Sequence, residues 1–89
     1  MNEELYELLE TEFLKYRIDE EVEDVLLELA ECLADSGKTG QECSYTERIG
    51  GAELTLYGTC EEAEDDEVSV FARALKINDE EYEINDYLL

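Results

Sequence analysis

The strongest structural signal in the chain lies in residues 42–60, which read ECSYTERIGGAELTLYGTC. Two alternating segments, 42–49 and 52–60, flank Gly50-Gly51, a favoured two-residue turn of a β-hairpin. Pairing across this turn sets Ile49 opposite Ala52, Arg48 opposite Glu53 and Tyr45 opposite Leu56. One face then holds Cys43, Tyr45, Ile49, Ala52, Leu54, Leu56 and Cys60, and the other holds Ser44, Thr46, Arg48, Glu53, Thr55, Tyr57 and Thr59. This alternation predicts a sheet with one covered and one solvated face.

The segments that follow the hairpin extend this sheet. Residues 61–67 contain six acids and are expected to form a loop, and residues 68–77 are rich in β-branched and apolar side chains and predict a third strand. A turn over 78–81 leads to a fourth, edge strand over 82–87.

The segments before the hairpin have the period of helices. Residues 3–16 place Leu5, Leu8, Leu9, Phe13 and Tyr16 broadly on one side, although Glu12 intrudes there and Leu14 lies off it. A second helix is expected over about 20–35, with Asp19 as N-cap and Ser36-Gly37 at its end. The predicted fold is α+β: two N-terminal helices on one face of a four-stranded antiparallel meander, as a single domain over residues 1–89.

The charge of the chain is strongly one-sided, with 27 Asp and Glu against 6 Lys and Arg and a formal net charge of -21. So few cations disfavour direct binding to nucleic acid or to an anionic membrane surface. The charge favours a basic protein partner instead, and most strongly basic protein surfaces hold nucleic acid. Disorder is opposed by a patterned hydrophobic content of 44%. Adaptation to high salt is an alternative that the sequence leaves open.

The acids of the second predicted helix are the first candidate contact site. They are spaced by four, four, three and four residues and fall within a sector of about 80°, over a length of about 22 Å. They are Glu20, Asp24, Glu28, Glu31 and Asp35. A duplex carries a regular row of negative charge on a comparable scale, so such a row fits a groove built for a phosphate backbone. The alternative is an ordinary solvated helix face.

The acidic loop is the second candidate contact site, and its acids are Glu61, Glu62, Glu64, Asp65, Asp66 and Glu67. Leu27 and Ala34 border the acidic side of the second helix, where they either extend the core or form a small apolar spot in a partner contact.

The residue types that most enzymes need are scarce. The chain has no His, so it lacks an ordinary general base and any Ser-His or Cys-His pair, and we expect no catalytic residues and no cofactor. Cys32, Cys43 and Cys60 form no CxxC pair, which predicts free thiols in a reducing cytoplasm and no metal site. No signal peptide or membrane-length apolar run is present.

Small, single-domain, very acidic phage proteins form a class that this chain resembles. The resemblance rests on its size, its net charge, the row from Glu20 to Asp35 and the run from Glu61 to Glu67. The class includes anti-CRISPR proteins, anti-restriction proteins and inhibitors of uracil-DNA glycosylase. It implies a nucleic-acid mimic that covers the DNA-binding or PAM-reading surface of a host defence complex in the host cytoplasm.

We therefore expect an acidic binding protein that blocks the basic nucleic-acid-binding surface of a partner, with a CRISPR effector complex as the first candidate. The main alternative is a cytosolic adaptor or assembly factor that docks on a basic protein without inhibiting it. Either a monomer or a homodimer is compatible with the sequence.

Overall fold

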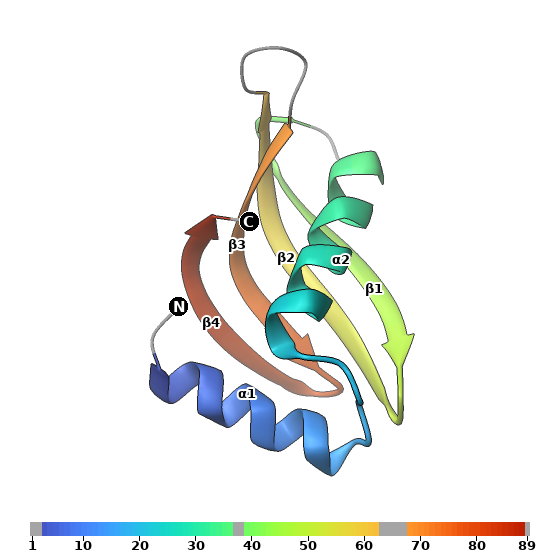
Figure 1. Cartoon of the computed structure of the whole chain (residues 1–89). Coiled ribbons are helices and arrows are strands. Elements are labelled where there is room, and N and C mark those ends of the chain that lie inside the picture. The colour runs from blue at the N-terminus through green and yellow to red at the C-terminus, as the bar shows by residue number, and fades with distance from the viewer. Residues whose placement is uncertain (1–2, 37–38, 63–67, 89) are drawn as a thin grey trace.

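The computed structural model of the chain describes residues 3–36, 39–62 and 68–88. Two helices, α1 (Glu3–Lys15) and α2 (Val22–Ser36), precede four strands: β1 (Glu42–Ile49), β2 (Ala52–Glu62), β3 (Val68–Ile77) and β4 (Glu80–Leu88). The strands form one antiparallel sheet in the order β1-β2-β3-β4. The α+β fold with element order α-α-β-β-β-β is therefore confirmed. Both helices lie on the same side of the sheet (Figure 1).

The hairpin register follows the prediction. Ile49 pairs with Ala52, Arg48 with Glu53 and Tyr45 with Leu56. Along β2 the buried and partly exposed positions alternate, because successive side chains of a strand point to opposite faces. On the outer face, which no helix covers, the Thr46 and Thr55 hydroxyls lie 2.8 Å apart across the two strands.

Three predicted boundaries are wrong by two residues. Helix α2 begins at Val22, with the Glu21 carbonyl accepting the first hydrogen bond from the Val25 amide, so Asp19 is not its N-cap and Glu20 precedes the helix. Strand β2 runs on to Glu62, because its last residues pair with the start of β3. The last turn is shorter than expected, since β4 already begins at Glu80.

The core lies between α2 and the sheet. Helix α2 packs on β1, β2 and β3 and buries a complete apolar face against them. The buried residues of α2 are Val22, Val25, Leu26, Leu29, Ala30 and Leu33. A Cβ atom on Gly58 would lie 2.9 Å from the Phe71 carbonyl oxygen and 3.3 Å from Cδ2 of Leu33. The missing side chain of Gly58 therefore lets the helix and β3 approach the middle of β2 closely.

Helix α1 crosses the end of the sheet near the β3–β4 turn and adds Leu9 and Phe13 to the core (Figure 1). Leu8 was predicted on its apolar side but is 44% exposed, and Leu14 is 79% exposed. Within the described residues, no helix is long and apolar enough to cross a membrane.

The connection between the helices is held by a defined C-terminal motif. The Ile18 amide donates to the Phe13 carbonyl at 2.8 Å, and the Arg17 amide donates to the Leu14 carbonyl at 3.2 Å. These two bonds, with Arg17 at a φ of 59°, match a Schellman motif. The connection also docks on the β1–β2 turn, where the Gly51 amide donates to the Tyr16 carbonyl at 2.8 Å. This long-range contact fixes how α1 meets the start of α2.

Candidate functional site

Four of the five exposed acids of α2 form a row, which we call the acidic helical face: Asp24, Glu28, Glu31 and Asp35. All four are exposed, and the buried apolar face of the helix lies opposite them. At 1.5 Å per residue the row extends about 16 Å along the helix axis. The structure therefore brings together four of the five predicted helical acids on one solvent-facing surface.

Helix α2 itself contains no basic residue that could offset this row. Among the residues that the structure describes, none of the four acids has an ion-pair partner. Acids in the first turn suit the helix dipole, but Glu31 and Asp35 lie toward the C-terminal end, where negative charge is unfavourable. The like charges also repel one another at spacings of three and four residues. Helix stability therefore does not explain the C-terminal half of the row.

Leu27 lies beside the acidic helical face and is 48% exposed, whereas Ala34 is partly buried against the core. The alternative left open by the sequence is thus resolved differently for the two residues. Leu27 forms an apolar spot next to the acids, and Ala34 extends the core.

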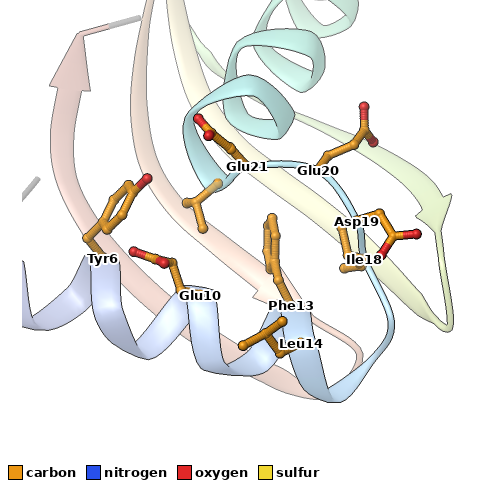
Figure 2. Close-up of a pocket in the computed structure, with 9 residues that line it drawn as sticks. Tyr6, Glu10, Phe13, Leu14, Ile18, Asp19, Glu20 and Glu21 are labelled. Atoms are coloured by element: carbon orange, nitrogen blue, oxygen red, sulfur yellow. The ribbon is translucent and has the colours of Figure 1, made fainter.

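Glu20 precedes α2 and lines a pocket, so it does not belong to the helical row. This pocket, of about 310 Å³, lies between α1 and the first turn of α2. Its lining residues are Tyr6, Glu10, Phe13, Leu14, Ile18, Asp19, Glu20, Glu21 and Val22. Figure 2 shows Tyr6, Glu10 and Glu21 on one side of the Phe13 ring, with Ile18, Asp19 and Glu20 on the other side. The pocket thus combines apolar walls with an acidic rim.

The pKa of the Tyr6 hydroxyl reflects the negative potential at this pocket. Partial burial raises this pKa, and the Glu10 carboxylate raises it further. The acids at the start of α2 act in the same direction: Glu23, Glu21 and Asp24. Asp24, which belongs to the acidic helical face, thus also acts on a hydroxyl that lines the pocket.

The second predicted site is described only in part. Glu61 and Glu62 are exposed residues at the end of β2, and Glu64, Asp65, Asp66 and Glu67 lie outside the described residues. Glu62 follows the alternation of the buried Cys60 and so lies on the helix side of the sheet, whereas Glu61 lies on the outer face. The Gly40 amide donates to the Cys60 carbonyl at 2.9 Å, which holds the segment after α2 against this end of β2. Glu62 thus lies on the same side of the sheet as α2 (Figure 1).

Glu47 is an acid on the covered face of the sheet. Its register partner is Leu54, a fully buried core residue. Its Oε2 atom is buried and has no hydrogen-bond partner in the described part of the chain. The neighbouring Tyr45 hydroxyl has a raised pKa, first through its hydrogen bond with Cys32 and then through nearby charges that include Glu47 and Glu28. The covered face of the sheet therefore also carries an acid, Glu47.

No disulfide joins Cys32, Cys43 and Cys60 in the described part of the chain, and burial raises the pKa of the Cys60 thiol. Within the described ranges, no three Cys, Asp or Glu side chains are grouped in a way that could hold a metal ion.

The pocket is the feature that the sequence interpretation missed. Tyr6, Glu10 and Glu21 come from two elements whose contact depends on the docking of the α1–α2 connection on Gly50 and Gly51. The sequence pattern predicts Asp19 and Glu20 as the N-cap and first turn of the helix, whereas both precede α2 and line the pocket. A search of known proteins gave no significant match to a family model, to a curated protein or to a solved structure. Surface chemistry is therefore the guide to what this molecule binds.

Proposed function

We propose that this protein is an acidic inhibitor that binds the basic nucleic-acid-binding surface of a partner protein through the acidic helical face. A CRISPR effector complex of the host is the first candidate partner, and an anti-CRISPR role in the host cytoplasm is the corresponding function. The protein acts by occupying the surface and not by catalysis.

The observation that carries the proposal is the row of four exposed acids on α2, which has no basic neighbour on the helix. Neighbouring acids in the row are about 5 to 6 Å apart along the axis, which gives one carboxylate per helical turn. A nucleic-acid channel is lined by Lys and Arg that neutralise a regular row of phosphates, and counterion release contributes much of its affinity. A folded row of carboxylates offers such a channel the same sign of charge, at a lower linear density than the one charge per about 3.4 Å of a single strand in a duplex.

A displacement assay tests the proposal directly. Purified effector complexes are incubated with labelled target DNA at ~0.15 M salt, and the protein is then titrated in. We expect the wild-type protein to release the DNA from at least one complex, with an apparent affinity that falls steeply with added salt.

Matched variants assign that effect to α2. The helix variant carries Asp24→Asn, Glu28→Gln, Glu31→Gln and Asp35→Asn. The control variant removes the same number of charges from the outer face of the sheet, with Glu42→Gln, Glu53→Gln, Glu81→Gln and Glu83→Gln. We expect the helix variant to lose at least tenfold in displacement, a difference of about 1.4 kcal/mol, and the control variant to lose much less.

Two results would contradict the proposal. The first is equal loss in the two variants, which would mean that net charge and not the helical row determines binding. The second is an absence of DNA release from every complex tested. Binding to a basic protein without release of its nucleic acid would favour the adaptor role.

A further inference from the structure

The pocket between α1 and α2 has two kinds of wall. The apolar wall consists of Phe13, Ile18 and Val22, which are buried, and of Leu14, whose side chain is 79% exposed. Phe13 and Ile18 are joined by the Schellman motif, so this wall is held by backbone hydrogen bonds as well as by packing. The position of this apolar wall is therefore fixed by the fold.

The second wall is acidic. Four of the nine lining residues are carboxylates, and none of the nine is basic. Glu10 comes from α1 and Glu21 from the residue before α2, and both lie with Tyr6 on one side of the Phe13 ring (Figure 2). These acids thus approach one space from two elements.

A ligand that fits such a pocket is cationic at its tip and apolar along its stem. The pocket, of about 310 Å³, has room for a single side chain. Arginine meets these requirements better than lysine, because its planar guanidinium binds carboxylates in a bidentate way.

We propose that this pocket takes an arginine side chain of the basic partner, with the guanidinium between Glu10 and Glu21 and the methylene stem along the exposed side chain of Leu14. The inference rests on the proposed function, since it names one further contact with the same basic partner. The acidic helical face would supply the long-range attraction, and the pocket would fix the position of one anchoring residue. Buried arginine anchors of this kind are typical of binding hot spots.

Titration with an isolated arginine derivative tests the pocket without knowledge of the partner. Nα-acetyl-arginine-N-methylamide is added to ¹⁵N-labelled protein, and the amide shifts are followed by NMR. We expect binding on the order of 10 mM, since a single free side chain makes few contacts. The shifts should concentrate at Phe13, Leu14, Ile18, Glu21 and Val22. The lysine derivative should bind more weakly, and the neutral citrulline derivative should cause no comparable shifts.

A matched pair of variants locates the contact. Glu10→Gln with Glu21→Gln removes two charges from the pocket, whereas Glu3→Gln with Glu7→Gln removes two exposed charges from elsewhere on α1. All four positions are exposed, so the fold should persist, which the amide spectrum checks directly. We expect the pocket variant to weaken arginine binding about fivefold and the control to leave it nearly unchanged.

The inference is overturned if the shifts spread evenly over all acidic surfaces, if citrulline binds as well as arginine, or if the two variants behave alike. Equal or tighter binding of the lysine derivative would overturn the assignment to arginine. None of these outcomes affects the displacement assay, because the acidic helical face can act without the pocket. Conversely, a failed displacement assay leaves the arginine titration interpretable.

Discussion

The acidic helical face of α2 and the outer face of the sheet differ in whether basic residues lie among their acids. On the outer face, the Arg73 guanidinium lies 2.8 Å from Glu42 and also over the Tyr57 ring. Arg48 and Lys76 share that face, because they pair with outward-facing residues of β2. The face therefore holds three of the six basic residues of the chain. The acidic helical face holds four acids and no cation.

This difference concerns where the charged residues lie, which the net charge of the chain does not give. A chain with a net charge of -21 must expose many acids, so a negative surface alone says little about function. Of the six cations, Arg48, Arg73 and Lys76 lie on the outer face of the sheet, and Lys15 and Arg17 lie at the end of α1 and in the connection that follows it. Helix α2 carries acids alone, which is the arrangement that attracts a basic partner and steers its approach.

The largest expected effect comes from disturbing the close contact of α2 and β3 with Gly58 in the middle of β2. Gly58→Val puts atoms within reach of the Phe71 carbonyl and Leu33, so α2 or β3 must shift. We expect a loss of about 1 to 3 kcal/mol in the free energy of unfolding, measured by urea denaturation. Thr59→Val, at the next, half-exposed position on the outer face, serves as the control. A change for Gly58→Val no larger than for this control would show that the close approach is unimportant.

The matched charge variants give the next effect and compare the two faces directly. Neutralising Asp24, Glu28, Glu31 and Asp35 removes the repulsion within three neighbouring pairs of acids on α2. This should raise the free energy of unfolding by about 1 kcal/mol at low salt. Neutralising Glu42, Glu53, Glu81 and Glu83 should raise it less, because Arg73 loses its partner. The gain for the helix variant should shrink with added NaCl. Equal gains for both variants would remove the distinction between the faces.

Glu47 allows a test of negative charge on the covered side of the sheet. Glu47→Leu removes a buried carboxylate oxygen that has no hydrogen-bond partner among the described residues. We expect a stabilisation of about 1 kcal/mol by thermal or urea unfolding, since the cost of desolvating this oxygen disappears. Glu61→Leu, at an exposed position of the same sheet, should change stability by less than about 0.5 kcal/mol. Destabilisation by Glu47→Leu would mean that this carboxylate makes a favourable contact.

The smallest effect concerns alkaline pH. Burial raises the pKa of Tyr82, and a hydrogen bond of 2.6 Å from its hydroxyl to Oε2 of Glu80 raises it further. A raised pKa means that the neutral phenol stabilises the folded state below the unfolded pKa of about 10, and that this contribution declines as pH rises above it. Tyr82→Phe should therefore reduce the slope of stability against pH between about 10 and 11. An unchanged slope would contradict the raised pKa.

Local periodicity in the sequence determined the elements and their faces. The alternation around Gly50-Gly51 predicted the register of Tyr45 with Leu56, because side-chain direction in a strand has a period of two. The spacing of Asp24, Glu28, Glu31 and Asp35 likewise predicted one exposed row, since residues three and four apart share a helix face.

Contacts between distant segments decided the rest. The Tyr16 carbonyl accepts a hydrogen bond from Gly51, and this contact positions the α1–α2 connection, whose Glu20 and Glu21 line one pocket with Glu10 and Tyr6. Pairing with β3 drew Glu61 and Glu62 into β2 and so turned them to opposite sides of the sheet. Leu14 lies off the apolar side of α1, and Leu8 lies at the margin of the row Leu5, Leu9, Phe13 and Tyr16 that packs on the core, so both are exposed. Sequence periodicity gives the direction of each side chain within its own element, but packing between elements determines what that side chain meets.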